Sequence, residues 1–213
     1  MNGRLCRLGG AALVGGSVLL GAVEVVLRLT GGADGDDPTN PVNIAAHGVG
    51  MLAGLLLIVG LPTLVAALGT RAPALSVAGF VLLTASILVY EIAIGLLDTV
   101  VLPYLTANHL NPSQPPAAMF PFFMGGGFAQ IIGNLLLGIA ILRTGLFSRI
   151  SGMLLIAAGV ILLITLAPLP EWVDTISALA MLSGLGLVGA QLAGIPAGWP
   201  ATRRASPAAS LSA

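Results

Sequence analysis

Lysine is absent from this chain, and charged residues of every kind are scarce. Only 8% of the 213 residues are charged, whereas 57% are hydrophobic and the mean hydropathy is +1.04. A soluble domain usually carries about a quarter charged residues, so this chain cannot cover a water-exposed surface. All eight basic residues are arginine, which points to a GC-rich bacterial genome. The composition therefore excludes an ordinary soluble globular protein.

Other absences exclude whole classes of function. Cys6 is the only cysteine, so neither an intramolecular disulfide nor a cysteine-based metal cluster can form. The sequence has no HExxH motif, no phosphate-binding loop, no dinucleotide fingerprint and no nucleophile elbow. Its arginines are spread over separate segments, so no nucleic-acid-binding patch exists. We therefore predict no catalytic residue, no metal site, no cofactor and no nucleic-acid partner. Carboxylate chemistry leaves one metal-site alternative open, built from Glu24, His47, Glu91 and Asp98.

What the chain does have is long apolar runs. Six of them approach or exceed the roughly 20 residues that cross a bilayer. We predict an all-α polytopic bundle of six transmembrane helices, at about 8–29, 44–68, 74–101, 119–142, 150–168 and 175–195. Segments rich in Gly, Pro and Asp separate the spans. Residues 1–195 then form one domain, and the tail 196–213, rich in Pro, Ala and Ser, is expected to be disordered.

The charges outside the spans are sorted by sign. Seven of the eight arginines fall on one side of a six-span bundle, with Arg28 as the exception, and five acids fall on the other: Asp34, Asp36, Asp37, Glu171 and Asp174. Arginine is enriched in the cytoplasmic loops of membrane proteins. Both termini are therefore predicted to be cytoplasmic, and we expect a multi-pass protein of the bacterial cytoplasmic (inner) membrane.

The third predicted span carries two carboxylic acids within apolar sequence. In the stretch VYEIAIGLLDTVVLPYL, Glu91 and Asp98 are seven residues apart, and Thr84 lies seven residues before Glu91. Seven residues of α-helix make almost two turns, so the three side chains are expected on one stripe that faces the bundle interior. A charge at mid-membrane costs roughly 2.5–3.5 kcal/mol on insertion scales, so each acid is a functional candidate. The plainer alternatives are an interfacial acid for Asp98 and a protonated or hydrogen-bonded structural acid for Glu91.

Further polar side chains fall at a similar depth. Glu24 and Arg28 are four residues apart, in the order that favours an ion pair on one helix face. His47 lies about one turn inside the second span, where it can bind a carboxylate or titrate near neutral pH. Gln130 and Asn134, again four apart, are interpreted as structural groups that hydrogen-bond between helices. Mutual neutralisation of the first pair and a structural role for the histidine are the alternatives.

These groups lead to a first functional hypothesis. We expect a polar pocket in the outer half of the membrane, covered by the loop 102–118 with Tyr104 and His109. Its candidate ligand-binding or proton-carrying residues are Glu24, Arg28, His47, Glu91 and Asp98. The pocket would bind or transport a small or amphipathic ligand taken from outside or from the outer leaflet. Glu91 is its central acid.

A second hypothesis uses the small residues of the spans. Gly50 and Gly54 in the second span, and Gly186, Ala190 and Gly194 in the sixth, follow a spacing that favours close helix contacts. Such faces suit a non-catalytic accessory or scaffold subunit that docks onto another membrane protein. A membrane enzyme ranks third, because no nucleophile and base can be assembled.

One segment resembles a known family. In LGIAILRTGLFSRISGMLLIAAGV (137–160), two apolar spans are joined by a Thr-Gly-x-Phe turn between two basic residues; the matching positions are Arg143, Thr144, Gly145, Phe147, Arg149 and Gly152. The pattern resembles an uncharacterised family of small bacterial multi-pass membrane proteins, a domain of unknown function. The resemblance implies a tight cytoplasmic turn between two spans. It supplies no functional residue, because that family has no established activity.

Overall fold

The protein is built from long helices. The structure, a computed structural model, describes residues 3–30, 39–110, 119–164 and 172–194. Its helices are α1 (Gly3–Leu29), α2 (Pro41–Leu68), α3 (Pro73–Ile87), η2 (Leu88–Ile94), η3 (Leu97–Val101), α4 (Leu102–Ala107), α5 (Met119–Thr144), α6 (Arg149–Ile164) and α7 (Trp172–Ala193). The four segments from α3 to α4 run on without a break and form one rod from Pro73 to Ala107. The described residues contain no strand.

Six helical rods therefore make up the bundle. Five of them are long and apolar enough to cross a membrane, and α6 is a shorter apolar helix. The predicted end of the fifth span, residue 168, lies outside the described residues. The prediction of an all-α, six-helix polytopic membrane bundle is confirmed.

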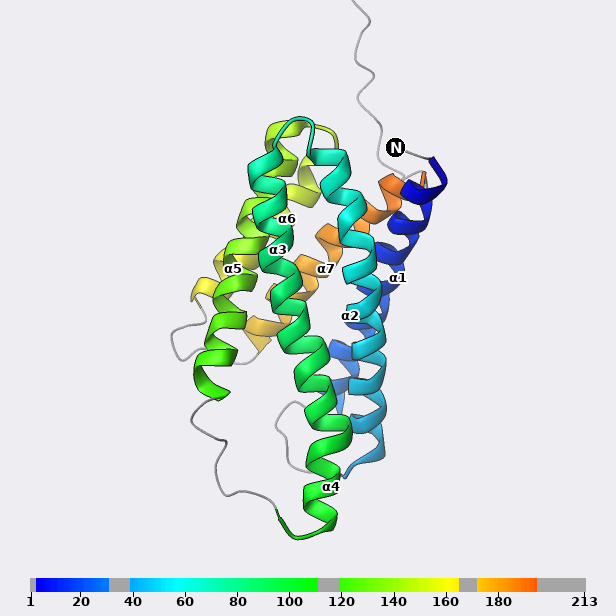
Figure 1. The fold of residues 1–213 in the computed structure, drawn as a ribbon, viewed down its shortest axis with the longest axis vertical. Helices are drawn as coiled ribbons and strands as arrows, with labels where there is room; N and C mark the ends of the chain where they lie inside the picture. Colours follow the sequence, from blue (N-terminus) through cyan, green and yellow to red (C-terminus); the bar gives the residue numbers. More distant parts are fainter. Residues whose placement is uncertain (1–2, 31–38, 111–118, 165–171, 195–213) are drawn as a thin grey trace, which may run out of the picture.

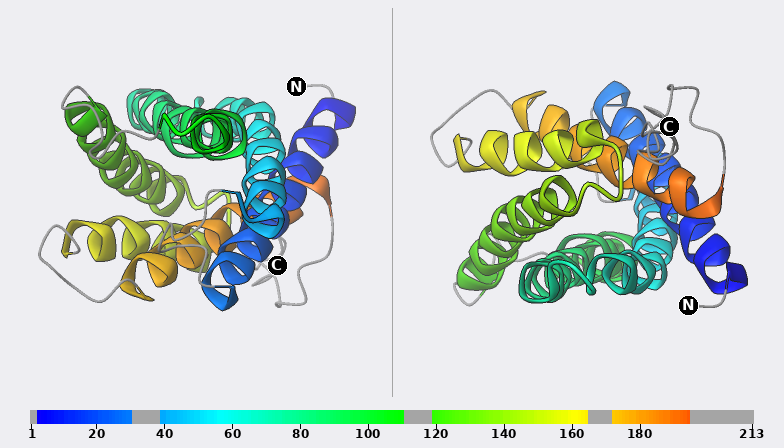
Figure 2. Two further views of the ribbon diagram at one scale, coloured as in Figure 1. Left: turned by 90° about the horizontal axis from the view of Figure 1, so that it is seen from below. Right: turned by 90° about the horizontal axis from the view of Figure 1, so that it is seen from above.

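The rods form a ring that follows the order of the chain. α1 packs against α2, the third rod packs against α2 and α5, and α6 lies between α5 and α7. The ring closes where α7 packs against α1, which joins the two ends of the chain (Figure 2). A polar group that points inward from any rod therefore meets several other rods across a shared interior.

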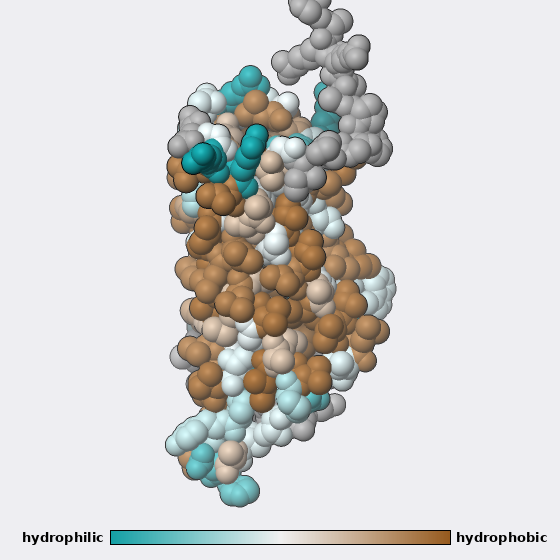
Figure 3. Space-filling model, turned by 90° about the vertical axis from the view of Figure 1, so that its right-hand side faces the viewer, coloured by the Kyte–Doolittle hydropathy of each residue, from teal (hydrophilic) through white to brown (hydrophobic). Residues whose placement is uncertain are grey.

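The two ends of the bundle differ. The start of α1, the connection between α2 and α3, and the connection between α5 and α6 lie at one end, together with the end of α7 (Figure 1). We call this the arginine end, because it carries Arg4, Arg7, Arg71, Arg143 and Arg149. Apolar side chains cover the middle of the molecule, and hydrophilic residues are concentrated towards its two ends (Figure 3). This banding is what a bilayer requires of a spanning protein.

A glycine and two hydrogen bonds hold the connection between α5 and α6 at the arginine end. Gly145 follows α5 with a positive φ of 59°, a conformation that glycine adopts without strain. Arg71 Nη1 donates to the carbonyl of Thr144 at 2.8 Å, and so satisfies a free carbonyl at the end of α5. The Ser148 backbone N–H donates to Gln191 Oε1 at 3.0 Å, which ties this turn to α7. The turn predicted from the sequence is thus held from two sides.

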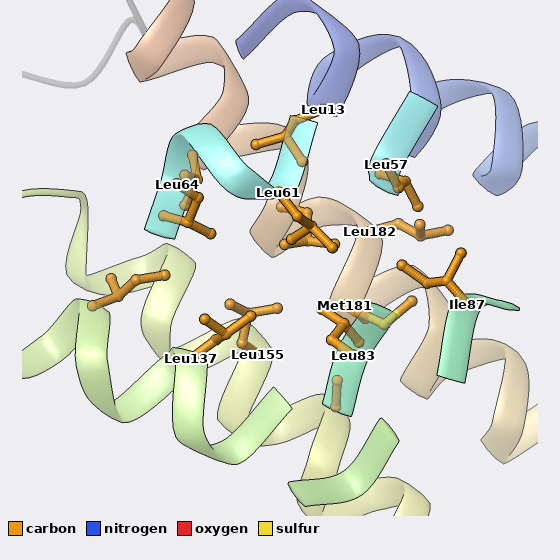
Figure 4. Packing of buried hydrophobic residues seen from close by; sticks show 14 of the residues in the cluster. Leu13, Leu57, Leu61, Leu64, Leu83, Ile87, Leu137, Leu155, Met181 and Leu182 are labelled. Atoms are coloured by element: carbon orange, nitrogen blue, oxygen red, sulfur yellow. The ribbon is translucent and has the colours of Figure 1, made fainter. Parts of the chain in front are cut away.

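The core is aliphatic and lies towards the arginine end of the interior. Leu13, Leu57, Leu61, Leu83 and Leu137 are fully buried and meet from four different rods (Figure 4). In a membrane such contacts stabilise through close packing, because lipid chains are as apolar as leucine.

Glycine pairs bring neighbouring backbones together. A Cβ at Gly10 would lie 2.6 Å from the carbonyl oxygen of Gly189, and a Cβ at Gly189 would lie 2.7 Å from that of Gly10. The two backbones come close at this pair, which is not part of the small-residue face predicted for the sixth span. A Cβ at Gly186 would lie 3.4 Å from Ser17 Cβ, an ordinary contact, and a Cβ at Gly194 would meet nothing within 4 Å.

Candidate ligand pocket

The third rod changes its helical geometry where it carries the acids. Both η2, which contains Glu91, and η3, which contains Asp98, are π-helical. In a π-helix the hydrogen bonds span five residues instead of four, so a spacing of seven no longer returns side chains to one stripe. The α-helical geometry from which one stripe of Thr84, Glu91 and Asp98 was predicted therefore does not hold at the two acids. Such segments are rare and often occur at functional sites.

Both acids nevertheless face α2. A Cβ at Gly54 would lie 2.7 Å from Glu91 Cβ, and a Cβ at Gly50 would lie 3.5 Å from Glu91 Oε2. The missing side chains of these two glycines provide the space that Glu91 occupies. Further along, Asp98 Oδ2 lies 3.5 Å from His47 Nε2, so this acid has a basic partner on α2. The two acids thus have different surroundings.

A cavity of about 390 Å³ opens beside Glu91 and is enclosed by α1, η2, α5 and α7, with one residue from α6. Its polar lining residues are Glu24, Arg28, Tyr90, Glu91, Gln130, Asp174, Thr175 and Ser177. Met181 and Leu182, which belong to the core, form its floor (Figure 4). The cavity therefore lies between the aliphatic core and the end opposite the arginine end.

A second cavity, of about 200 Å³, lies on the α2 side of the same acid. It shares Glu24, Tyr90 and Glu91 with the larger cavity, and it is also lined by His47. Asp98 lines neither of the two. The structure thus brings together four of the five candidate residues predicted from the sequence and leaves Asp98 beside them as the partner of His47.

The larger cavity is lined by more acidic than basic side chains. Among its described lining residues, three carboxyl groups face one guanidinium: Glu24 and Arg28 come from α1, Glu91 from η2 and Asp174 from α7. Glu24 and Arg28 both line this cavity, as their spacing on one helix face allows. Arg28 reaches across to α7, where its Nε donates to Thr175 Oγ1 at 2.7 Å. This bond fixes the guanidinium at one edge of the cavity.

Aromatic rings line the side towards α5. The Tyr90 hydroxyl donates to the carbonyl of Phe123 at 2.9 Å, which holds η2 against α5. A Cβ at Gly126 would lie 2.8 Å from Val89 Cγ1, so the glycine allows this close approach. Phe123 and Phe128 line the cavity beside Tyr90. Three aromatic rings thus line the cavity, and the hydrogen bond of Tyr90 holds one of them in place.

The two amides of α5 differ. Gln130 Oε1 accepts from Ser86 Oγ at 3.4 Å, and its Nε2 lies 3.6 Å from Met181 Sδ, so Gln130 connects α5 to two other helices. Asn134, one turn further, is fully buried, and neither polar atom of its amide has a hydrogen-bond partner among the described residues. Only Gln130 lines the cavity.

The cover expected over the pocket is not seen in the described residues. Residues 102–107 form α4, which prolongs the third rod beyond the rest of the bundle (Figure 1). Tyr104 is 64% exposed, His109 is exposed with a positive φ of 57°, and neither lines either cavity. Residues 111–118 lie outside the described residues, as does the tail 196–213.

The sequence analysis did not single out four of the polar lining residues, Tyr90, Asp174, Thr175 and Ser177. Asp174 was counted only as an acid of the outer side, whereas it lies in the first turn of α7 and lines the cavity beside Thr175. A usable signal was present, because Asp174, Ala178 and Met181 follow the spacing of one helix face. Tyr90 gave no comparable signal, since its place depends on the π-helical turn of η2.

Two further findings concern metal binding and similarity to known proteins. Within the described residues no three side chains of His, Cys, Asp or Glu converge closely enough to hold a metal ion. Comparison of the chain with protein-family models, with curated proteins and with solved structures finds no match.

Proposed function

We propose that this protein binds a small amphipathic ligand in the cavity beside Glu91 and takes part in its passage through the membrane. The observation that carries the proposal is a cavity of about 390 Å³ inside an apolar bundle, lined by both acids and aromatic rings. Sites for small molecules typically have about 300–1,000 Å³ and combine an apolar lining with a few polar groups. Ionisable groups within a membrane are costly, which favours a functional reason for several of them together.

The proposal includes a location and an orientation. We place the protein in a bacterial cytoplasmic membrane with the arginine end in the cytoplasm, because arginine is enriched in cytoplasmic loops. Glu24 lies near the end of α1 and Asp174 near the start of α7, so both are remote from the arginine end. The cavity then lies in the outer half of the membrane. Membership of the bacterial family suggested by the 143–152 turn belongs to the same proposal.

The accessory-subunit alternative has less support. It depended on small-residue faces that would dock onto another membrane protein. Gly50 and Gly54 are buried and pack against Glu91 within the chain itself, and Gly186 packs against Ser17 of α1, whereas a Cβ at Gly194 would meet nothing within 4 Å. No specific observation on the described residues favours an external docking face over the cavity.

Blocking the cavity tests the proposal. Ala178 of α7 lines it, and Ile176, two residues away, is exposed on the outside of the bundle. The variant Ala178→Trp should fill the cavity, whereas Ile176→Trp adds the same ring outside it. Small amphipathic compounds of positive, negative and zero charge would be screened by thermal shift, with the protein in lipid nanodiscs.

The expected result is a compound that stabilises the wild type and Ile176→Trp but not Ala178→Trp. If no compound of any charge distinguishes Ala178→Trp from Ile176→Trp, this cavity is not the binding site and the proposal fails.

A proton-carrying role for Glu91 has a separate test. If ligand binding is linked to a proton on this carboxyl group, the affinity of the wild type varies with pH, and Glu91→Gln loses that variation. The measurement is the affinity of one bound compound between pH 5 and pH 9. An identical pH profile in the wild type and Glu91→Gln would refute the proton-carrying role and leave ligand binding intact.

A further inference from the structure

We infer that the ligand is an organic cation with an apolar body, such as a hydrophobic quaternary ammonium. This inference rests on the proposed function and specifies the ligand class. Three features of the larger cavity carry it. Acids outnumber bases in the lining, aromatic rings are part of the wall, and the acids surround a space that is larger than a single metal ion.

The balance of acidic and basic side chains favours a cationic ligand over an anionic one. Three carboxyl groups face the cavity from three different helices, and the single guanidinium, that of Arg28, is turned towards Thr175 by a 2.7 Å hydrogen bond. An anion would enter against the repulsion of like charges, which is poorly screened in a low-dielectric interior. A cation lowers the mutual repulsion of Glu24, Glu91 and Asp174. The electrostatic potential of the cavity thus favours a positively charged ligand.

The aromatic wall distinguishes an organic cation from a metal ion. Tyr90, Phe123 and Phe128 line the cavity together with the acids, and ring faces attract ammonium groups. The Tyr90 hydroxyl is already bonded to a backbone carbonyl, so its ring is held in position. The acids do not converge as metal ligands do, since no group of three forms a metal site among the described residues. They surround a space that a molecular cation can fill.

The lining also fits an apolar body. Leu20, Met124, Ile131 and Leu162 come from three helices and complete the wall between the acids and the core. Two lining residues are exposed at the surface, Asp174 at the polar end and Phe128, 46% exposed, on the side of α5. The cavity wall therefore reaches the surface at one acidic and one aromatic position. An amphipathic cation matches both.

The test compares three probes with one apolar body. A phenylbutyl chain carries either a trimethylammonium group, its neutral tert-butyl isostere or a carboxylate. Affinities are measured by calorimetry with the protein in nanodiscs of zwitterionic lipid, and empty nanodiscs correct for partitioning. We expect the cation to bind about tenfold or more tightly than the neutral isostere, since cation–π and carboxylate contacts both distinguish the two. The carboxylate should bind most weakly.

Matched variants locate the selectivity. Glu91→Gln and Asp174→Asn should each weaken binding of the cation severalfold and leave the neutral isostere unchanged, which also shows that the cavity remains folded. Asp98→Asn is the control, because Asp98 is an acid of the same rod that does not line the larger cavity. It should leave the affinity for the cation unchanged.

The outcomes separate the inference from the proposed function. If the neutral or anionic probe binds as tightly as the cation, and Ala178→Trp still abolishes binding, the ligand class is overturned and the function stands. Equal weakening of the cation by Glu91→Gln and Asp98→Asn also overturns the inference, because the effect would then not be specific to the cavity. If Ala178→Trp affects none of the three probes, the proposed function fails and the inference fails with it.

Discussion

The contact between α2 and η2 can be tested with a single methyl group. Gly48, Gly50 and Gly54 lie on the same helix, but a Cβ at each would meet different surroundings. At Gly48 it would meet nothing within 4 Å, and at Gly50 its nearest atom, Glu91 Oε2, would be 3.5 Å away. At Gly54 it would lie 2.7 Å from Glu91 Cβ. Substitution of each by alanine therefore adds the same group to open space, to an ordinary contact and to a collision.

The magnitude follows from the comparison of the three. Each substitution gains roughly 0.5–1 kcal/mol in helix propensity, so this contribution cancels between the variants. Carbon atoms pack best at about 3.5–4.0 Å, so Gly54→Ala must push Glu91 and η2 away from α2 by about 1 Å. Overpacking of this kind costs about 1–3 kcal/mol. We expect Gly54→Ala to be less stable than Gly48→Ala by about 1–3 kcal/mol, with Gly50→Ala close to Gly48→Ala.

The assay is reversible unfolding in detergent micelles, followed by far-UV circular dichroism, for the wild type and the three variants. Ligand affinity provides a second reading, because the displacement of Glu91 by Gly54→Ala should also weaken binding of the cation. If Gly54→Ala is as stable as Gly48→Ala, the predicted collision with Glu91 does not occur. That result would mean that η2 does not rest directly on α2 at Gly54.

Three further predictions concern hydrogen bonds and use the same unfolding assay. Thr175→Val removes the acceptor of the Arg28 Nε bond and should lower stability by about 1.5–3 kcal/mol; no loss would mean that the bond does not hold α1 to α7. Tyr90→Phe should lose about 0.5–1.5 kcal/mol and keep its affinity for the cation, because the ring stays in place; lost affinity would place the hydroxyl in the binding site. Asn134→Leu should gain about 1–3 kcal/mol, because it removes an amide buried without a partner; a loss of that size would show that the amide is hydrogen-bonded.

Much of the fold could be predicted because a membrane restricts it. Spanning segments must be long, apolar and helical, so hydropathy alone located the six rods. The sorting of arginines and acids by sign placed the connections between α2 and α3 and between α5 and α6 at one end. The close approach at Gly189 was not predictable in this way, since small residues occur on several faces of α7. The helix that each face meets depends on the closure of the ring.

The candidate site could be predicted only in part. Glu24, His47 and Glu91 stood out, because each is an ionisable group in apolar sequence. The change to π-helical bonding in η2 leaves no simple mark in the sequence, so the helical geometry at Glu91 was not predicted. The partner of Arg28 was also missed. Thr175 is distant in sequence and comes close only because α7 packs against α1.

The two acids of the third rod differ in whether the described chain supplies a basic partner. Asp98 lies 3.5 Å from His47 Nε2, so the chain itself supplies a base to stabilise its charge. Glu91 accepts no hydrogen bond and forms no ion pair within the described structure; beside it lie two glycines of α2 and two cavities. An ionised carboxylate in a low-dielectric interior needs a counter-charge, or else it takes up a proton. In the proposed function, a proton neutralises Glu91 in the empty cavity and a bound cation does so in the filled one. Exchange between these two partners would couple entry of the ligand to release of a proton, and the pH profile of Glu91→Gln measures that coupling directly.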